Sequence, residues 1–369
     1  MSVRKKNVTL RDVARYAGVS IKTVSNVIND WPYMTDETRA KVREAIKIVG
    51  YRPNQMARSL VTGQTKSVGV IIPDIINPFF SLTLRGCEDL FYKNGYSLFL
   101  CNSLEIEERE KYYLDVLASR AVDAVILWST QIARDELRTM IGERLPVVTV
   151  GFDGDPLNDS HTIVNLDDIG GSERATQHLI AQGYRQIAHL TTFAHNVVGS
   201  KRLKGYRQAL ESADRQYDPQ LVKKNRASIY GGYHATLDLL EHYPVDAIFC
   251  HNDLMAVGAI FAAHHLGRRV PEDIGIVGFD DIAMASMVTP PLTTMRITQY
   301  EMGKLTGELI LERLRQEVTA PKTVLYPVEL QIRTSSGGTE STEEQKQQWV
   351  EDLVSHLSIE SSPEKNSSQ

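Results

Sequence analysis

Near the start of the chain, short polar side chains recur at the spacing of one face of an α-helix. Lys22, Ser25, Asn26 and Asn29, with Ile21 beside them, fall on the same side of a helix that begins after Ser20. Their ammonium, hydroxyl and amide groups can form hydrogen bonds with base edges in a DNA major groove. The alternative is a small helical hairpin with an ordinary solvated face. The pattern therefore favours a DNA-reading helix, provided that neighbouring elements hold it in place.

The residues around this helix are suited to hold it. Apolar residues recur at i, i+3, i+4 and i+7 over 10–17, which predicts a first helix with one buried stripe. Thr9 is a candidate N-cap of that helix, Gly18 can take a positive φ just past its end, and Ser20 is a candidate N-cap of the next. A third helix is predicted after Thr35. The start of the chain is therefore predicted to be a small helical domain that contains a helix-turn-helix.

Charge separates this small domain from the rest of the chain. Residues 1–62 contain twelve Lys and Arg but five Asp and Glu, a net charge of +7, whereas the whole chain has −5 and residues 63–369 therefore have −12. Only the part that meets a polyanion gains from releasing its counterions. A basic module attached to an acidic remainder therefore supports DNA binding by the first sixty residues.

Three longer runs within residues 8–60 extend this interpretation. They read TLRDVARYAGVS, TVSNVIN and GYRPNQMARSL, and they resemble the DNA-binding headpiece and hinge of the LacI/GalR family of bacterial transcription repressors. The resemblance implies that Ile21, Lys22 and Asn26 are the principal base readers. Many relatives have arginine where this chain has Asn26, so the operator sequence cannot be taken from them.

Residues 54–60 have two interpretations. They are good helix formers but span fewer than two turns, so in isolation they should be mostly unfolded in water. They are either an ordinary linker or a helix that folds on DNA. The resemblance implies the second, with the hinge helices of two subunits paired in the minor groove and Leu60 wedged into a base step. The residues predicted to contact DNA are Thr9, Ser20, Ile21, Lys22, Thr23, Ser25, Asn26, Asn29, Tyr51, Asn54, Ala57 and Leu60.

Beyond residue 63, short apolar runs alternate with amphipathic helical stretches. The runs include SVGVIIP, YSLFLCN, VDAVILWST, LPVVTVGF, RQIAHLTT, VDAIFCHND and DIGIVGFDD. Strands of four to seven residues that alternate with longer helices predict parallel α/β sheets. Neither Gly-x-Gly-x-x-Gly nor a P-loop motif is present. The chain therefore lacks the glycine-rich phosphate-binding loop of dinucleotide-binding folds and that of nucleotide-hydrolysing folds.

The resemblance to the LacI/GalR family also covers this region. The matching blocks are VGVIIPDIINPFFSLTLRGCED, NDLMAVGAI, VPEDIGIVGFDDIAMASMVTPPLTT and VELQIRTS. They imply a core similar to periplasmic sugar-binding proteins, in which two α/β subdomains joined by three crossovers enclose a ligand cleft. The predicted fold class is α/β, with a small all-α helix-turn-helix domain before this two-subdomain, periplasmic-binding-protein-like core with parallel sheets.

These patterns predict four segments along the chain. A helix-turn-helix domain covers 1–52 and a hinge helix 53–62. An effector-binding and dimerisation core covers 63–334, its N-subdomain about 67–165 and 297–325 and its C-subdomain about 166–294 and 327–334. Residues 335–369 are rich in Ser, Glu, Gln and Lys and are predicted to be a disordered tail. A short helical pattern inside that tail leaves a tetramer possible.

Candidate effector ligands follow the ends of predicted strands, where open α/β sheets usually bind small molecules. Phe79 and Phe80 match family positions for aromatic ligand contacts, and Asp280 matches an acidic residue that contacts the effector in many relatives. Alternatively, Phe80 packs in the core and Asp280 caps a helix. Arg202 and Asn252 also match family pocket positions, although either can be a surface pair or a turn residue.

Two further positions are less direct. Relatives that bind sugars often carry an Asp-Arg pair after the strand that here reads VVTVGF, whereas this chain has Gly151 and Phe152. An aromatic ring there can stack on a base or another flat ring, which leaves the effector class open. Trp128 is either a further wall or a core residue, and Asp253 is predicted to cap the helix that begins LMAVGAI. The residues predicted to bind effector are Phe79, Phe80, Phe152, Asp167, Arg202, Asn252 and Asp280.

Several kinds of site and location are not favoured. No apolar run approaches the ~18–20 residues of a membrane span, and the basic N-terminus has no signal-peptide pattern, so we expect a cytoplasmic protein. The three cysteines, Cys87, Cys101 and Cys250, are predicted to be buried reduced thiols. The histidines lack metal-ligand spacing, so no metal and no cofactor is expected.

The sequence therefore predicts a transcriptional regulator, in particular a repressor. It would bind a pseudo-palindromic operator in double-stranded DNA as a homodimer, and its operator affinity would respond to a small metabolite such as a sugar, a sugar derivative or a purine-like compound. A solute-binding receptor of a transport system is the alternative, but it would need a signal peptide and no basic headpiece. An enzyme is not expected, because Gly-x-Ser-x-Gly is absent and no pair of acids is placed for catalysis.

Overall fold

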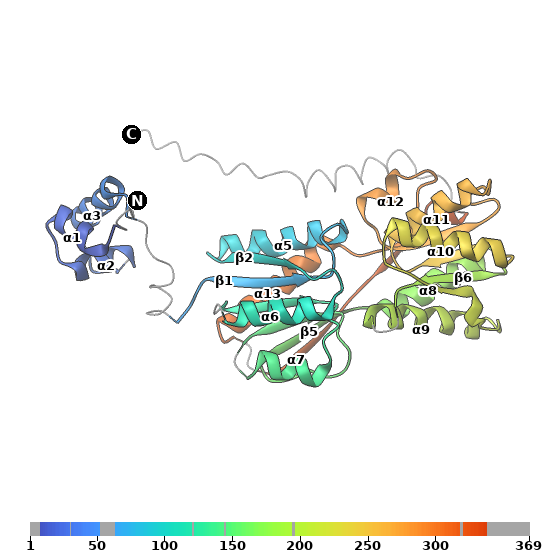
Figure 1. Ribbon diagram of the computed structural model, residues 1–369, viewed down its shortest axis with the longest axis horizontal. Coiled ribbons are helices and arrows are strands. Elements are labelled where there is room, and N and C mark those ends of the chain that lie inside the picture. Colours follow the sequence, from blue (N-terminus) through green and yellow to red (C-terminus); the bar gives the residue numbers. More distant parts are fainter. Residues whose placement is uncertain are drawn as a thin grey trace, which may run out of the picture. The chain divides into compact units, whose positions relative to one another are not determined.

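The computed structural model describes residues 8–29, 31–51, 63–119, 122–143, 145–193, 196–317 and 320–337. The chain divides into two units, Met1–Thr65 and Lys66–Gln369 (Figure 1). The predicted hinge segment 53–62 and most of the predicted tail lie outside the described residues.

The first unit contains the three predicted helices, α1 (Leu10–Ala17), α2 (Ile21–Ile28) and α3 (Asp36–Val49). Ser20 caps α2 by accepting a hydrogen bond from the Thr23 N–H at 3.0 Å, as predicted. Gly18 and Gly50 take left-handed conformations just past α1 and α3. The helices enclose a small core of Val13, Ala14, Ala17, Val24, Val27, Val42 and Ala45.

One half of the second unit is built on a six-stranded sheet whose strands are all parallel. Its order is β11 (Lys322–Tyr326), β5 (His161–Leu166), β4 (Val147–Val150), β3 (Ala124–Trp128), β1 (Ser67–Ile72) and β2 (Ser97–Asn102). The helices are α5 (Phe79–Lys93) and α13 (Gln299–Leu314), which pack together, and α6 (Glu107–Ser119) and α7 (Arg134–Ile141). We call this sheet and its four helices the N-lobe.

A second six-stranded sheet forms the other half of this unit. Its order is β12 (Glu329–Gln331), β10 (Thr293–Arg296), β9 (Gly275–Asp280), β8 (Ala247–Cys250), β6 (Ile187–Thr191) and β7 (Val222–Lys224). All neighbours are parallel except β12, which runs antiparallel to β10. The α-helices are α8 (Asp168–Ala181), α9 (Val197–Ser212), α10 (Ile229–His242), α11 (Asp253–His265) and α12 (Ala283–Met287), with 3-10 turns η1 (Pro219–Leu221) and η2 (Thr334–Ser336). We call this half the C-lobe.

The two lobes are interleaved along the chain. The path passes from one lobe to the other between β5 and α8, between β10 and α13, and between β11 and β12. Figure 1 shows α8 and α9 side by side in the C-lobe, with α10 and α11 packed together across the same sheet. The predicted fold class, parallel α/β sheets after a small helical domain, is thus confirmed.

The packing of α5 on α13 depends on two close backbone approaches. A Cβ atom added at Gly303 would lie 1.9 Å from the Thr83 carbonyl oxygen, and one added at Gly86 would lie 2.1 Å from the Tyr300 carbonyl oxygen. These distances leave no room for a larger residue. The two helices are therefore closely packed, and α5 begins at Phe79.

Candidate DNA-reading helix and ligand cleft

Helix α2 presents the polar face expected from its sequence. Val24 and Val27 are buried against the headpiece core, whereas Lys22 and Asn29 are exposed and Ile21 is 44% exposed. Ser25 and Asn26, one turn further along the same face, are half-buried. The buried valines fix the orientation of the helix, so its opposite side is left for an outside partner.

The other predicted DNA contacts lie in varied surroundings. Thr9 precedes α1 and donates to the Asp12 carboxylate through its N–H and hydroxyl, at 2.9 and 2.7 Å. The Thr23 hydroxyl pairs with that of Ser20 at 2.9 Å, and Tyr51 packs against the headpiece core. Asn54, Ala57 and Leu60 lie outside the described residues, so their predicted roles stay predictions.

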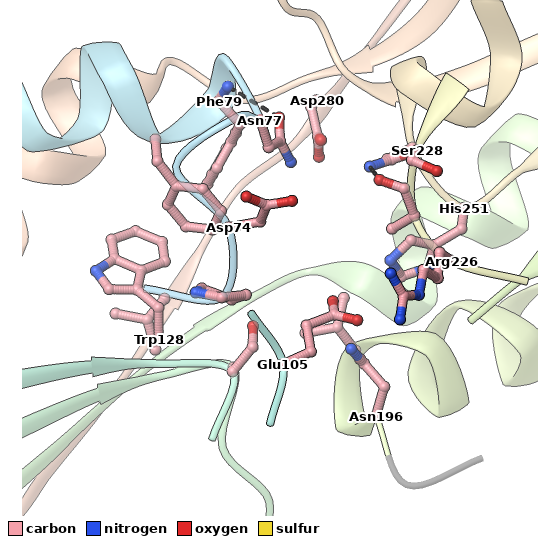
Figure 2. Close-up of a pocket in the computed structure, with 18 of the residues that line it drawn as sticks. Asp74, Asn77, Phe79, Glu105, Trp128, Asn196, Arg226, Ser228, His251 and Asp280 are labelled. Atoms are coloured by element: carbon pink, nitrogen blue, oxygen red, sulfur yellow. Dashed lines mark hydrogen bonds between the residues drawn. The ribbon is translucent and has the colours of Figure 1, made fainter. Parts of the chain in front are cut away.

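A cavity of about 300 Å³ lies where the carboxyl ends of strands from both lobes meet. Figure 2 shows Asp74, Phe79 and Trp128 of the N-lobe across this cavity from Arg226, Ser228 and His251 of the C-lobe. Five of the predicted effector residues line it: Phe79, Phe80, Arg202, Asn252 and Asp280. The structure thus brings together residues that are far apart in the sequence.

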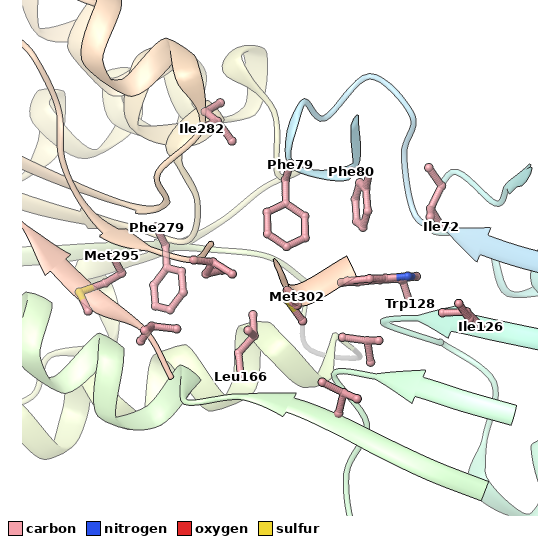
Figure 3. Packing of buried hydrophobic residues seen from close by; sticks show 14 of the residues in the cluster. Ile72, Phe79, Phe80, Ile126, Trp128, Leu166, Phe279, Ile282, Met295 and Met302 are labelled. Carbon is pink, nitrogen blue, oxygen red and sulfur yellow. The ribbon is translucent and has the colours of Figure 1, made fainter. Parts of the chain in front are cut away.

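The N-lobe wall of the cavity is aromatic. Phe79, Phe80 and Trp128 pack edge to face, with ring centroids 5.2 to 5.9 Å apart, and all three rings are buried (Figure 3). Such geometry suits the quadrupoles of the rings. Each of these residues belongs to the hydrophobic core and also lines the cavity, so the two alternatives for Phe80 and Trp128 do not exclude one another.

The C-lobe wall is built around Arg202, which is only 3% exposed. Its Nε donates to Asp168 Oδ1 at 2.8 Å, one terminal nitrogen lies 3.7 Å from Asp280 Oδ1, and another donates to the His251 carbonyl oxygen. The guanidinium carbon lies 3.6 Å from the centre of the Phe279 ring. Arg202 is therefore occupied by groups of the protein itself, and it holds two carboxylates beside the cavity.

Burial shifts the protonation of these groups. It raises the pKa of Asp280 to about 7, an effect that Arg202 opposes and Asp168 increases. Burial likewise raises the pKa of Asp168 and, with Arg202 nearby, lowers the pKa of His251 well below its usual range. His251 is therefore neutral near pH 7.

Helix α11 begins differently from the prediction. The residue that caps it is Asn252, whose side-chain oxygen accepts from the Met255 N–H at 3.0 Å. The predicted cap, Asp253, is wrong: this side chain is buried in the first turn and accepts from the Ile282 N–H and the Thr294 hydroxyl. A buried carboxylate needs such donors, and they come from distant parts of the chain.

Two predicted effector residues are placed away from the cavity. The Phe152 ring packs in a separate hydrophobic cluster, edge to face with His161 at 5.4 Å, and Gly151 lines the cavity beside it. Asp167 caps α8 by accepting from the Gly170 N–H at 3.1 Å, and it pairs with Arg174 at 3.0 Å. In this arrangement both residues have structural partners instead of facing the cavity.

The cavity also contains residues that the sequence analysis did not select. They include Asp74, Glu105, Asp168, Asn196, Arg226, Ser228 and His251. Their positions in the sequence could have identified several of them, because they follow the ends of predicted strands, where ligands of parallel sheets usually lie. Asp168, for example, comes two residues after β5.

The described part of the chain lacks two further features. Within it, no helix is long and apolar enough to cross a membrane, and no group of three or more His, Cys, Asp or Glu side chains is placed to hold a metal ion. Cys87 and Cys250 are buried, as predicted, whereas Cys101 is only partly buried, and all three are free cysteines. Burial raises the pKa of the Cys87 thiol to about 12.

Comparison with known protein families gives two matches. Residues 9–54 match the model described as bacterial regulatory proteins, lacI family, and residues 176–336 match that of a periplasmic binding protein-like domain. The first match covers α1, α2 and α3, and the second covers most of the C-lobe together with α13.

Individual proteins are similar over most of their length. The ribose operon repressor of Escherichia coli K12 is 37% identical over 311 residues, 84% of this chain and 93% of that protein. The transcriptional repressor PurR of Aliivibrio fischeri MJ11 is 34% identical over 314 residues, 84% of this chain and 92% of that protein. The structure of the lac repressor dimer bound to operator and the anti-inducer ONPF aligns with a TM-score of 0.79 and 26% identity, covering 90% of this chain and 99% of that one.

Proposed function

Since the chain belongs to the LacI family of bacterial regulatory proteins and is a DNA-binding, effector-controlled transcriptional regulator, we propose that it represses transcription as a homodimer on a pseudo-palindromic operator. Residues 1–52 read the DNA, 53–62 form the hinge, and a small metabolite in the cavity of the core 63–334 alters operator affinity. The protein works in the cytoplasm without a cofactor and is not an enzyme.

The observation that carries this proposal is the composition of the cavity wall. Phe79 comes from the N-lobe and Asp280 from the C-lobe, and both line the same cavity. A ligand that touches both favours one angle between the lobes, and it shifts the protein toward the state that it binds more tightly. Such a change can reach the DNA-binding unit without any contact between ligand and DNA.

One contact between the lobes supports this coupling. Lys201, on α9 of the C-lobe, donates from Nζ to the Phe152 carbonyl oxygen and to Asn165 Oδ1 of the N-lobe, both at 3.1 Å. A change in the angle between the lobes lengthens or breaks these two hydrogen bonds. The side of the cavity near α9 is therefore sensitive to lobe closure.

The DNA part of the proposal is tested by selecting binding sites for the full-length protein from a random DNA pool. We expect a two-fold-symmetric site, because a dimer presents two copies of α2. Lys22→Ala should change the selected bases, whereas Lys47→Ala, on helix α3, serves as a matched control and should not. A selection that returns no symmetric site contradicts the proposal.

The effector part is tested by screening sugars, sugar phosphates and purines for thermal stabilisation, since a ligand of the folded core raises stability by mass action. Operator affinity is then measured with and without each hit. Phe79→Ala should weaken ligand binding through the loss of aromatic contact area while ligand-free DNA binding persists. A hit that leaves operator affinity unchanged contradicts control by this cavity.

A further inference from the structure

The backbone is strained where β9 ends beside the cavity. Asp280 has a φ of 113° and Asp281 a φ of 52°, so two consecutive residues with a Cβ atom lie in the region that favours glycine. Such conformations cost free energy and persist only where the surrounding structure holds them, typically at ligand sites and switch regions. Asp280 also lines the cavity (Figure 2). We call Asp280 and Asp281 the β9 turn.

The C-lobe holds the β9 turn by the Asp281 side chain, which is 5% exposed. Asp281 Oδ2 accepts from Arg296 Nε at 2.7 Å, and Asp281 Oδ1 lies 2.7 Å from a terminal nitrogen of Arg333. Arg296 ends β10, and Arg333 follows β12, so both arginines belong to the C-lobe. Next along the chain, the Ile282 N–H donates to Asp253 Oδ2 at 2.8 Å.

The N-lobe holds the same turn by its carbonyl groups. Gln299, the first residue of α13, donates from Nε2 to the Asp280 carbonyl oxygen at 2.6 Å and to the Asp281 carbonyl oxygen at 3.2 Å. The glutamine is 8% exposed. The Asp280 carbonyl oxygen also accepts from the Ile297 N–H, at 3.4 Å. The amide of the opposite lobe is therefore the shorter of these two contacts.

The contact made by Gln299 depends on the angle between the lobes. The residue comes directly after the crossover from β10 to α13, so its amide moves with α13 when the N-lobe turns relative to the C-lobe. Hydrogen bonds weaken steeply when donor and acceptor are misaligned or drawn apart. A change in the lobe angle therefore releases the two carbonyl groups, and the β9 turn can then relax toward an ordinary φ.

We propose that Gln299 is a positioning residue that fastens the β9 turn to the N-lobe, so that Asp280 keeps its place in the cavity only at the lobe angle that the amide can span. When the angle changes, the amide leaves the two carbonyl groups and the Asp280 carboxylate moves with the turn. A ligand that displaces Asp280 acts on α13 through the same contact. The inference rests on the proposed function, because it names the contact that carries a change in the cavity to the N-lobe.

The test measures amide hydrogen exchange of the full-length protein by mass spectrometry, over the peptide that covers 278–284. Gln299→Met keeps the length of the side chain but removes the donor, so exchange in this peptide should become threefold faster or more. Thr306→Val is the matched control: it removes a buried hydrogen bond of the same helix, from the Thr306 hydroxyl to the Met302 carbonyl oxygen at 2.8 Å, and should leave this peptide unchanged. Wild-type exchange in folded Gln299→Met overturns the inference.

A third variant separates hydrogen-bond donation from packing. Gln299→Lys keeps a donor at a similar reach and should restore slow exchange in 278–284. Fast exchange in both the methionine and the lysine variant would mean that the shape of the glutamine holds the turn, and it would overturn the inference. Urea unfolding verifies that each variant is folded. If Gln299→Met does not fold, Gln299→Asn, whose amide is too short to reach, takes its place in every comparison.

The dependence on the lobe angle is tested through another contact between the lobes. Lys201 donates to the Phe152 carbonyl oxygen and to Asn165 Oδ1. Lys201→Met loosens the lobes at this contact and should speed exchange in 278–284 twofold or more. In the Gln299→Met background it should add nothing, because the contact that senses the angle is already lost. No effect of Lys201→Met alone, or additive effects in the double variant, overturn the inference.

Operator affinity separates this inference from the proposed function. In Gln299→Met, the affinity for the operator selected by the wild type should change threefold or more. Faster exchange with wild-type operator affinity supports the contact of Gln299 and contradicts the proposed control of DNA binding by the lobes. Wild-type exchange with a changed operator affinity overturns the inference and leaves the proposed function intact. If no symmetric operator is selected, the exchange measurements decide the inference by themselves.

Discussion

Replacing Arg202 with methionine should destabilise the second unit more than almost any surface change. The side chain is 4% exposed, its partner Asp168 is fully buried at 2.8 Å, and Asp280 is nearly so at 3.7 Å. Methionine keeps most of the apolar stem and its packing, so the main loss is the charge. Breaking a buried ion pair by removing one partner costs about 3–5 kcal/mol, because the other charge is left uncompensated.

That loss is large compared with the stability of a typical domain. Folded domains are stable by about 5–15 kcal/mol, so the variant should lose roughly a fifth or more of its free energy of unfolding at neutral pH. Urea unfolding followed by circular dichroism measures the change. Arg269→Met is the control: its pair with Asp273 spans the same 2.8 Å, but the arginine side chain is 71% exposed and solvent can replace it, so its removal should cost much less.

The loss should also depend on pH in a defined direction. In the folded protein burial raises the pKa of Asp280 to about 7, above the ~3.9 of an aspartate in an unfolded chain. The folded state therefore binds more protons between about pH 4 and 7, and stability falls as pH rises through that window. Without Arg202, which lowers the pKa of Asp280, the fall should be steeper and extend above pH 7.

Two outcomes would refute this reasoning. A destabilisation below ~1 kcal/mol at pH 8 would show that solvent, and not Arg202, neutralises the two carboxylates. An equal loss at pH 5 and pH 8 would show that packing, and not charge, is what the substitution removes. The prediction requires the loss to be smaller at pH 5, where protonation removes the uncompensated charge.

Three further substitutions test other parts of the molecule. Asn26→Ala should change base preference at the position it contacts, with a loss of ~1–3 kcal/mol for a bidentate contact; an unchanged site in DNA selection would count against it. Leu60→Ala should weaken operator binding by about a few kcal/mol, the energy of unstacking one base step, and should reduce the bend in the DNA. Wild-type affinity and wild-type bending would favour a plain linker. Gly303→Ala should lower the melting temperature, because its Cβ would lie 1.9 Å from the Thr83 carbonyl oxygen and overpacking costs ~1–3 kcal/mol; Gly307→Ala, which meets a flexible leucine side chain, should cost less.

The sequence alone was enough to predict the features that depend on neighbouring residues. Ser20 and Gly18 are found at the helix ends where their types place them, because a cap hydrogen bond and a positive φ are decided within a few residues. The alternation of apolar strands with helices likewise predicted two parallel sheets, since such strands are buried on both faces. The longer sequence motifs were enough to predict membership of the LacI family.

The tertiary structure decided which side chains meet. Arg202 and Asp168 are thirty-four positions apart and belong to different helices, so their ion pair depends on how α8 packs on α9. Phe152 and Asp167 follow strands, as ligand-binding residues of such sheets usually do. The Phe152 ring nevertheless packs in a hydrophobic cluster, and the Asp167 carboxylate caps a helix. Which way a side chain turns at the end of a strand depends on the partners available around it. Those partners come from segments that no local pattern brings together.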